Sequence, residues 1–433
     1  MSTLKAVRGT RDLLPPETAL WNRIEATARA VFARYNFGEI RTPVFEDTGL
    51  FARGVGAETD IVSKEMYTWE DRARAQSEKT QSLTLRPENT AGVVRAYIEH
   101  GLGESGLLQK LYYIGPQFRR ERPQKGRYRQ FSQIGAEVIG PPSAGSESPL
   151  RDAEVLEMLA TLLDELGIQG WTLHLNSVGS AADRARYNEA LRAALAPVVG
   201  QMCPDCQRRA ETNPLRVLDC KVPADQPIIE TLPMIADSLD EASRAHFAAV
   251  TAALDAAGVP YTRNHRLVRG LDYYTRTTFE FTHGGLGAQN ALLGGGRYDG
   301  LSEMLGGPRA PGIGFAIGED RLVLTLLAQL DQKSAPPQVA DAFVAPLGEG
   351  MNAAGLVLAR ELRAQGLWIE LGEGSFRLKK SFEAADKTAR QIIILGEDEL
   401  ASGILTVKNF STGAQSKVPR AELAVFLAEP AAN

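Results

Sequence analysis

A short basic stretch, residues 118–131, carries the side chains that point most directly to chemistry. It reads FRRERPQKGRYRQF, in which six residues are basic and one, Glu121, is acidic. The whole chain is mildly acidic, with 48 Lys and Arg against 53 Asp and Glu and a formal net charge of -5. Because that charge does not favour general binding of nucleic acid, the sequence predicts that any contact with a polyanion is local.

The segments on either side of this stretch alternate in polarity as β-strands do. One parity is apolar and is expected to form a core face: Tyr112, Ile114, Phe118, Ile134, Ala136 and Val138. The other parity would lie together on one accessible face of an antiparallel hairpin: Gln117, Arg119, Glu121, Phe131, Gln133 and Glu137. Arginine forks bind phosphate oxygens bidentately, so this face is typical of a small-molecule site. The alternative is an exposed hairpin whose arginines only add solubility, and the ordered polar row argues against it.

The length of 433 residues predicts two or three domains. Helical spacing predicts a helix over 17–35, and the region 181–259 is Ala-rich and expected to be mostly helical. The sequence SAPPQ at 334–338 is typical of a linker. Beyond it, strand and helix patterns alternate over about 95 residues, the size of a separate small α/β domain.

Three long segments resemble one family. The run YYIGPQFRRERPQKGRYRQFSQIGAEV is similar to the second signature motif of class II aminoacyl-tRNA synthetases, in the form found in histidyl-tRNA synthetases. RGLDYYTRTTFEF at 269–281 resembles the histidine-specific motif, and GIGFAIGEDRL at 312–322 resembles motif 3. The segments TLRPENT and LGGGRYDGL also match, whereas the chain has no Walker-type GxxxxGK[ST] sequence.

The resemblance implies an α+β fold, with the class II synthetase antiparallel sheet, flanking helices and a helical insertion, plus a C-terminal α/β anticodon-binding domain. The expected boundaries are a catalytic domain at 1–330, with the insertion at 181–259, a linker at 331–338 and the anticodon-binding domain at 339–433.

The implied reaction joins L-histidine to tRNA(His) in two steps. Histidine and ATP, with Mg²⁺, give a histidyl adenylate and pyrophosphate, and the histidine then moves to the 3'-terminal adenosine of the tRNA. Charge accumulates on the phosphoryl oxygens in the first step, so catalysis is mainly positioning and electrostatic stabilisation.

The family's roles fall on matching residues of this chain. Arg119 would clamp the α-phosphate, and Arg269 would stabilise the pentavalent phosphorus. The other implied ATP contacts are Glu121 to the adenine amino group, Phe131 stacked on the ring, and Arg127 with Arg321 on the distal phosphates. The glycines at 294–296 are expected to let the backbone approach the ligand closely.

Imidazole has two ring nitrogens, so a pocket that selects it needs matched polar partners. By resemblance these are Glu137 and Tyr274. The remaining implied histidine contacts are Glu88, Thr90 and Gln133 to the ammonium and carboxylate groups, and Tyr273 closing the pocket. Gln124 and Arg129 match positions near the tRNA acceptor end. Two residues depart from the family pattern, Asn89 where glycine is frequent and Arg120 where histidine or an aromatic residue is usual.

The three cysteines, Cys203, Cys206 and Cys220, are one ligand short of a structural zinc site if only Cys and His are counted. We expect reduced thiols and no metal site formed by a cluster of side chains, although a zinc site stays an open alternative. The sparse cysteines, together with the absence of a secretory signal or a long apolar run, predict a cytoplasmic protein without membrane contact.

The motif 1 resemblance of 17–35 and the Pro43 segment implies a two-fold homodimer. Three rival functions remain: a histidine-sensing regulatory paralogue, a class II synthetase for threonine, proline or glycine, and an RNA-binding protein. The first would tend to lose the ATP arginines, the second lacks the RGLDYY motif, and the third has no use for Gln133 and Glu137.

Overall fold

The computed structural model describes residues 3–56, 59–71, 80–124, 126–286, 290–329 and 339–428. The chain divides into two compact units, Met1–Ala335 and Pro336–Asn433. The predicted linker at 331–338 lies outside the described residues, so the domain boundaries stay a prediction. In the described ranges, none of the helices combines the length and the apolar character needed to span a bilayer.

The larger unit is built on a twisted sheet with the strand order β1-β5-β6-β11-β10-β9-β7-β8. Its neighbouring strands are antiparallel except for the outer pairs β1/β5 and β7/β8. The strands are β1 Gly38–Glu39, β5 Gln109–Phe118, β6 Gln130–Ile139, β7 Trp171–Ser177, β8 Thr262–Arg263, β9 Thr275–His283, β10 Ala291–Arg297 and β11 Gly312–Gly318. This antiparallel-rich sheet with flanking helices confirms the predicted α+β fold of the unit.

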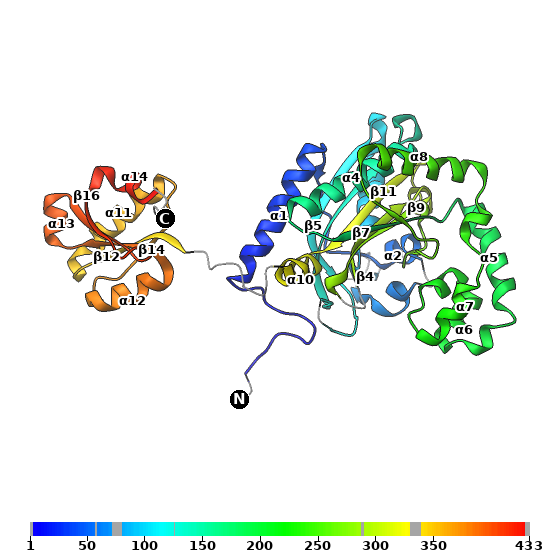
Figure 1. Ribbon diagram of the computed structural model, residues 1–433, viewed down its shortest axis with the longest axis horizontal. Coiled ribbons are helices and arrows are strands. Elements are labelled where there is room, and N and C mark those ends of the chain that lie inside the picture. Colours follow the sequence, from blue (N-terminus) through cyan, green and yellow to red (C-terminus); the bar gives the residue numbers. More distant parts are fainter. Residues whose placement is uncertain are drawn as a thin grey trace. The chain divides into compact units, whose positions relative to one another are not determined.

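Helices pack on the sheet with their apolar sides (Figure 1). The helices in the main core are α1 Glu17–Arg34, α4 Pro149–Glu165, α8 Glu241–Ala257 and α10 Glu319–Gln329. The apolar residues of α1 recur at helical spacing, so Ile24, Ala28 and Val31 are fully buried on one side. A separate cluster forms around α3 Thr90–Glu99 and α9 Leu301–Met304, with three tyrosines from the loops.

A three-stranded sheet, β2-β4-β3, also belongs to this unit, with strands β2 Phe45–Asp47, β3 Tyr67–Asp71 and β4 Gln81–Leu85. The helix α2 Thr48–Gly54 follows β2. The sequence SLTLR is typical of a strand and the residues after RPENT have helical spacing, and these segments form β4 and α3. The sequence over 268–281 is also typical of a strand, but this prediction is wrong at its start, since β9 begins only at Thr275 and the preceding residues form a loop.

The predicted helical insertion is confirmed as a lobe with its own apolar cluster (green in Figure 1). Its elements before α8 are α5 Ala181–Leu195, η4 Val199–Gln201, α6 Pro204–Thr212, η5 Pro214–Asp219, η6 Pro223–Asp225, α7 Gln226–Glu230 and η7 Ile235–Ser238.

The smaller unit has a mixed sheet in the order β13-β12-β14-β15-β16. The strands are β12 Ala340–Pro346, β13 Ile369–Leu371, β14 Ala389–Leu395, β15 Ile404–Asn409 and β16 Gln415–Pro419. The helices are α11 Asn352–Ala364, α12 Leu378–Thr388, α13 Glu397–Ser402 and α14 Leu423–Ala428. The alternating pattern predicts most of these elements, but not α13 and β16.

A buried ion pair ties the end of β10 to α4. Arg297 and Asp152 are both fully buried. The Nε and Nη2 atoms of Arg297 both donate hydrogen bonds to the Asp152 carboxylate. The Arg297 Nη1 atom also donates to the carbonyl oxygen of Ser146 at 2.9 Å. Arg297 Nη1 also pairs with Asp299 Oδ1 at 2.9 Å, so removing Asp152 would leave the buried guanidinium with one of its two carboxylate partners. Breaking a buried pair typically costs about 3–5 kcal/mol.

We therefore expect Asp152→Ala to lower the thermal unfolding midpoint of the larger unit by several degrees. The matched control is Glu165→Ala on the same helix, because Glu165 pairs with Arg34 at the exposed surface, where such pairs contribute about 0–1 kcal/mol. Calorimetry of the full chain measures both. A midpoint for Asp152→Ala that matches the control would contradict the structural role of this pair.

Candidate active site

The predicted hairpin is present, and its register sets the site. β5 and β6 pair antiparallel, with Gln117 opposite Phe131 and Leu111 opposite Glu137. The expected core residues Tyr112, Ile134, Ala136 and Val138 are buried in the main cluster, and Ile114 packs against it. The polar parity is not the accessible face that the sequence predicts. Gln117, Gln133 and Glu137 are buried, because the other face of the hairpin is covered by side chains that enclose cavities.

The first cavity, of about 280 Å³, opens where the hairpin strands end. Arg119 and Glu121 reach it from just beyond β5, and Phe131 and Gln133 from β6. Arg321 contributes from the first turn of α10. The lining residues that the sequence predicts as ATP contacts or catalytic are Arg119, Glu121, Arg127, Phe131, Arg269 and Arg321.

Arg119 is held in a fixed orientation at this cavity. Its Nε atom donates to the carbonyl oxygen of Pro87 at 2.8 Å. Its guanidinium carbon lies 5.4 Å from the centre of the Phe131 ring, a cation–π contact. Both contacts orient the planar group without using its two terminal nitrogens, which suits binding of phosphate oxygens.

Positive charge accumulates in this cavity. Burial lowers the pKa of Arg321, and the neighbouring Arg127 guanidinium contributes in the same direction, with Arg269 adding a smaller effect. Arg127 donates to Glu121 Oε2 at 3.1 Å. Arginines that face one another across a cavity repel, so a polyanion placed between them is stabilised.

Arg269 lies in the loop before β9 and pairs with Glu280 on that strand. Glu280 is opposite Gly294 of β10. A Cβ atom on Gly294 would lie 2.5 Å from the guanidinium carbon of Arg269, so only glycine leaves room for this arginine. The glycines at 294–296 lie inside β10. Atoms of Arg269, Gly314 and Tyr274 occupy the space that side chains at these three positions would need.

The second cavity, of about 140 Å³, adjoins the first and shares Arg119, Gln133 and Arg269 with it. It is lined by the residues that the resemblance assigns to histidine: Glu88, Thr90, Gln133, Glu137, Tyr273 and Tyr274. The buried Gln133 Oε1 atom has no hydrogen-bond partner within the described part of the chain, so a donor on a ligand would satisfy it.

Glu137 is fully buried at the centre of this second cavity and is fixed by hydroxyl donors. Thr90 Oγ1 donates to its Oε1 atom at 2.8 Å, and Tyr298 OH donates to its Oε2 atom at 2.7 Å. On β11, a Cβ atom at Gly314 would lie 1.6 Å from Glu137 Oε2. The carboxylate thus occupies the space that a side chain at 314 would need.

Burial raises the pKa of Glu137 to about 8, while the hydroxyls of Tyr298 and Thr90 partly oppose the rise. Burial also raises the pKa of Glu88, although the backbone N–H groups of Ala91 and Thr90 act against it. These N–H groups donate to Glu88 at 3.0 and 2.7 Å at the start of α3. Two carboxyl groups in one small cavity, both with raised pKa values, are suited to a ligand that donates hydrogen bonds or carries positive charge.

The two departures from the family pattern have structural explanations. Asn89 has φ -114° and ψ -18°, a conformation that does not require glycine. Its Oδ1 atom accepts from Thr42 Oγ1 at 3.2 Å. Arg120 lies outside the cavities, where its backbone N–H donates to Glu65 O and its guanidinium carbon lies 5.7 Å from the Tyr67 ring centre.

Gln124 and Arg129 line neither of these two cavities. Gln124 is exposed and bridges to Arg127 at the tip of the hairpin. Arg129 is bound to the N-terminal segment, since its backbone N–H donates to Gly9 O at 2.7 Å and its Nη1 to Arg8 O at 3.2 Å.

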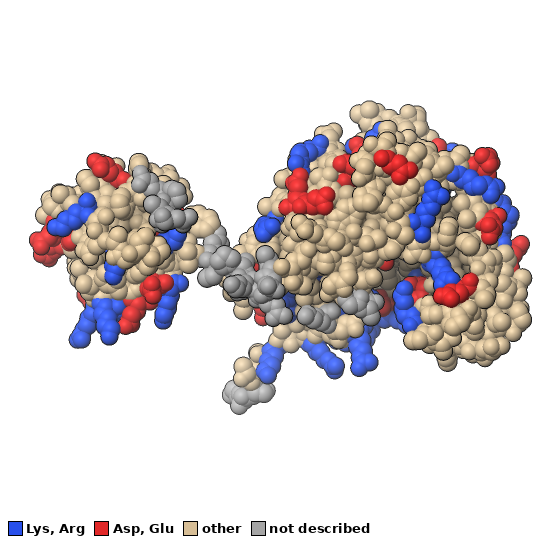
Figure 2. All heavy atoms as spheres, viewed as in Figure 1, with Lys and Arg blue, Asp and Glu red and all other residues tan. Residues whose placement is uncertain are grey.

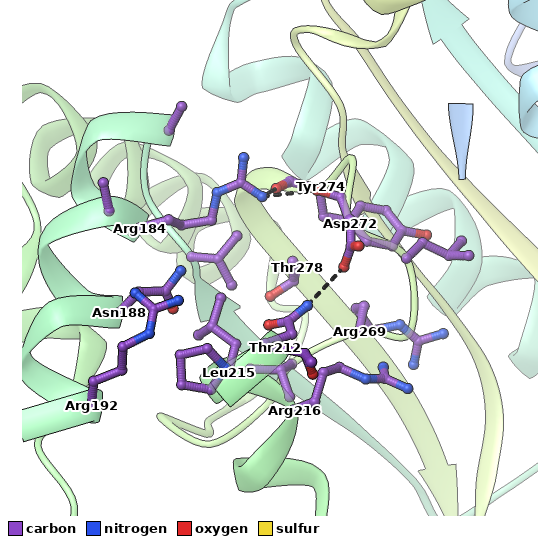
Figure 3. A pocket seen from close by; sticks show the side chains of 17 residues that line it. Arg184, Asn188, Arg192, Thr212, Leu215, Arg216, Arg269, Asp272, Tyr274 and Thr278 are labelled. Carbon is purple, nitrogen blue, oxygen red and sulfur yellow. Dashed lines mark hydrogen bonds between the residues drawn. The ribbon is translucent and has the colours of Figure 1, made fainter. Parts of the chain in front are cut away.

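A further cavity, of about 370 Å³, lies between the insertion and the loop 269–274 (Figure 3). Arg184 of α5 donates to the carbonyl oxygens of Asp272 and Tyr274 at 3.0 and 2.6 Å. Asn213 donates to Asp272 Oδ1 at 3.1 Å. The insertion therefore positions the loop that carries the tyrosines of the second cavity.

Tyr298, Gly314 and Glu280 belong to the site although the sequence does not predict them. Tyr298 and Gly314 lie within LGGGRYDGL and GIGFAIGEDRL, and Glu280 lies at the end of RGLDYYTRTTFEF. Their roles are visible only in three dimensions, because each acts by contacting a residue from another segment.

Comparison with known proteins identifies a family for both units. The sequence matches the family described as "Histidyl-tRNA synthetase" over residues 9–322 and the one described as "Anticodon binding domain" over 341–429. It is 74% identical to the histidine--tRNA ligase of Koribacter versatilis (strain Ellin345), over 98% of this chain and 96% of that protein. Identity to the histidine--tRNA ligase of Solibacter usitatus (strain Ellin6076) is 57%, over 98% of this chain and 99% of the relative. The crystal structure of apo S. aureus histidyl-tRNA synthetase superposes with a TM-score of 0.79 at 38% identity, covering 99% of this chain and 100% of that chain.

The raised pKa of Glu137 predicts a specific pH dependence of stability. Its folded pKa of about 8 lies above the ordinary value of 4.5, so the folded chain retains a proton that the unfolded chain releases. Stability from this group is therefore present below pH 4.5 and is lost progressively up to about pH 8. In Glu137→Gln the side chain stays neutral, so we expect the stability of this variant relative to wild type to rise across that range.

Denaturant unfolding of the ligand-free chain at a series of pH values measures the difference between the two proteins. Because Glu319 also has a raised pKa and is present in both, its contribution cancels in the comparison. A difference that is independent of pH between 4.5 and 8 would mean that Glu137 is ionised in the folded chain.

Proposed function

This chain belongs to the histidyl-tRNA synthetase family, and we propose that it ligates L-histidine to tRNA(His) through a histidyl adenylate. In the first step a histidine carboxylate oxygen attacks the α-phosphorus of ATP, the bond to the β-phosphate oxygen breaks, and pyrophosphate leaves. In the second step a hydroxyl of the 3'-terminal adenosine attacks the histidyl carbonyl carbon, and AMP leaves.

The observation that carries this proposal is the junction of the two cavities. Arg119, Gln133 and Arg269 line both of them. A nucleotide in the larger, arginine-rich cavity and an amino acid in the smaller one would meet at these three residues. Such a junction allows an in-line attack of one bound substrate on the other. Positioning of this kind lowers the activation free energy by roughly several kcal/mol.

The roles on the nucleotide side follow from the geometry and charge. Arg119 clamps the α-phosphate with its two terminal nitrogens, one of which lies 3.9 Å from Glu121 Oε1 in the ligand-free chain. Arg269 stabilises the negative charge of the pentavalent phosphorus from the loop before β9. Phe131 offers its ring to the adenine, and Glu121 accepts from the adenine amino group. In the ligand-free chain Arg127 forms an ion pair with Glu121. On ATP binding Arg127 would exchange this carboxylate for a phosphate, so that Arg127 and Arg321 both bind the distal phosphates.

On the amino-acid side, Glu137 and Tyr274 select imidazole. A carboxyl oxygen of Glu137 accepts from one ring N–H, and the Tyr274 hydroxyl pairs with the other nitrogen. Glu88, Gln133 and the remaining lone pairs of Thr90 bind the ammonium and carboxylate groups, and Tyr273 closes the pocket. A buried carboxyl group left without this partner costs free energy, so amino acids lacking an imidazole are rejected strongly.

We assign tRNA contacts to two regions. Gln124 and Arg129 at and beside the hairpin tip approach the acceptor end. The smaller unit is the anticodon-binding domain, and Figure 2 shows basic side chains on the side of it where Figure 1 places α12. That helix carries Lys379 and Lys387, and Lys379 is 89% exposed. Exposed lysines of this kind suit either recognition of the anticodon or simple solvation of the helix.

Mg²⁺ would enter as a complex with ATP. The carboxylates lining the first cavity are Glu121, Glu280 and Asp320, and each pairs with an arginine. This arrangement does not offer the protein oxygens of a dedicated cage, whereas Mg²⁺ commonly uses substrate phosphates and one or two carboxylates. Glu280 is a residue that could complete its coordination, since Glu121 is assigned to the adenine amino group.

We further propose a cytoplasmic homodimer. Three cysteines without disulfides are consistent with a reducing compartment. The sheet β2-β4-β3 exposes Phe45 and Trp69, whose ring centres lie 6.0 Å apart, and the preceding Val44 is also exposed. An aromatic pair on a short sheet next to the Pro43 segment is a suitable centre for a two-fold interface.

ATP–pyrophosphate exchange tests the activity and the role of Arg269. With wild type we expect histidine alone among the twenty amino acids to support exchange. Arg269→Ala should reduce exchange at least about 100-fold, the usual loss for one electrostatic donor to a transition state, while circular dichroism stays unchanged. The control is Arg266→Ala, three residues earlier, whose side chain faces Glu230. Near-normal exchange by Arg269→Ala removes this residue from the mechanism, and exchange with another amino acid but not histidine overturns the assignment.

Sedimentation or light scattering tests the dimer. We expect a mass of about twice the 46.9 kDa chain for wild type, and a shift toward the single-chain mass for Trp69→Glu, since a charge at an apolar interface centre is costly. Trp368→Glu is the control, because Trp368 is also exposed but belongs to the smaller unit. A single-chain mass for wild type contradicts the dimer.

A further inference from the structure

Four side chains of the insertion converge on one point: Cys203, Cys206, Cys220 and Asp225. Their sulfur and carboxylate oxygen atoms all lie within 4.8 Å of one another. The Cys203 and Cys220 sulfurs are 4.0 Å apart, and Cys220 Sγ lies 3.3 Å from Asp225 Oδ2. The fourth ligand is a carboxylate, so a count of Cys and His alone does not reveal this set.

Two of the separations are close to those of a tetrahedral site. With Zn–S bonds of about 2.3 Å and a Zn–O bond of about 2.0 Å, tetrahedral geometry places sulfurs about 3.8 Å apart and a sulfur and an oxygen about 3.5 Å apart. The Cys203–Cys220 sulfur separation of 4.0 Å and the Cys220–Asp225 sulfur-to-oxygen separation of 3.3 Å each lie near these values. A single ion at the centre would need only small side-chain movements.

The burial of Asp225 is a second observation that points to a cation. Its side chain is 1% exposed, yet in the described part of the chain no Lys, Arg or His lies within ion-pair distance of it. Its oxygens accept from the Cys203 backbone N–H at 3.1 and 3.2 Å. A buried carboxylate with no positive partner is costly, and a bound cation would supply that charge.

The surroundings of the four ligands favour a closed, structural site. Cys206 is fully buried and Cys220 nearly so, and both belong to the apolar cluster of the insertion. The ligands come from separate short segments: Cys203 caps α6, Cys206 lies within it, Cys220 ends η5, and Asp225 ends η6. Short elements of this kind have little apolar surface of their own, so a cross-link among them adds stability.

We propose that these four residues bind one Zn²⁺ ion that cross-links the insertion. Thiolates select a thiophilic metal over Mg²⁺ or Ca²⁺, and four protein ligands leave no open position for catalysis. The site is separate from the proposed reaction. Its effect would be on the position of η5 relative to the rest of the unit. Asn213, directly before η5, donates to Asp272, and Arg216 within η5 lies 3.7 Å from Asp60.

A cross-linked insertion would hold the loop that carries Tyr273 and Tyr274 in place.

The competing state is a Cys203–Cys220 disulfide, whose sulfurs would have to approach to about 2.05 Å. That state would leave the Asp225 carboxylate buried without a partner of opposite charge. Metal content and thiol content distinguish the two states.

The test uses the full chain expressed with zinc in the medium and purified with a reductant but no chelator. We expect about one zinc per chain by inductively coupled plasma mass spectrometry. Since changes beside a metal ligand already cost roughly 10–100-fold in affinity, loss of a ligand in Cys206→Ser, Cys220→Ser or Asp225→Asn should reduce retained zinc at least about tenfold. Asp205→Asn is the control, because Asp205 lies between the two cysteines of the same motif but its side chain is 64% exposed.

Cobalt(II) titration of wild type keeps the test decisive if a cysteine variant does not fold. Bound cobalt should show the intense visible bands of tetrahedral geometry and a thiolate-to-cobalt charge-transfer band, and added zinc should remove both. Wild type with negligible zinc and no such bands overturns the proposal. So does equal zinc loss in Asp205→Asn and Asp225→Asn, or a Cys203–Cys220 disulfide in metal-free protein.

Discussion

The carboxyl group of Glu137 lies on the buried face of an antiparallel sheet, and several neighbouring residues are constrained by it. Gly314 must lack a side chain because the carboxylate fills that space. Thr90 and Tyr298 must supply hydroxyl donors, since a buried carboxyl group without hydrogen bonds would destabilise the fold. These residues come from β6, β11, α3 and the loop after β10, so one polar group fixes the relative positions of four elements.

The same constraint joins binding to catalysis. Glu137 lies on the same strand as Gln133 and Phe131, and the strand's period of two points all three to one face. The seven residues of β6 from Phe131 to Glu137 therefore extend from the first cavity to the second. Arg269 reaches this junction from the loop before β9. Arg184 of the insertion donates to the carbonyl oxygens of two residues of that loop, Asp272 and Tyr274. The insertion therefore contributes to the geometry of the site without lining its centre.

The sequence was sufficient for the elements whose periodicity is strong. Alternation predicts the β5–β6 hairpin and its core face, and helical spacing predicts α1 and α3. The polar face was expected to be open, and it is buried because loops distant in sequence cover it. The segment before β9 has apolar and aromatic residues typical of a strand, but its residues turn away to fill the pocket instead. Asp225 and Tyr298 could not be assigned from local patterns, since their roles depend on contacts with segments far along the chain.

The central claim is that one continuous site accepts adenylate and imidazole together, and a non-hydrolysable sulfamoyl analogue of histidyl adenylate tests it most directly. Calorimetric titration of the full chain with this analogue, followed by titration with ATP and with histidine, measures whether the two halves share one site. The account predicts that one analogue per chain binds far more tightly than either substrate and abolishes binding of both. If ATP or histidine still binds with unchanged affinity to the saturated chain, the two cavities do not form a single site.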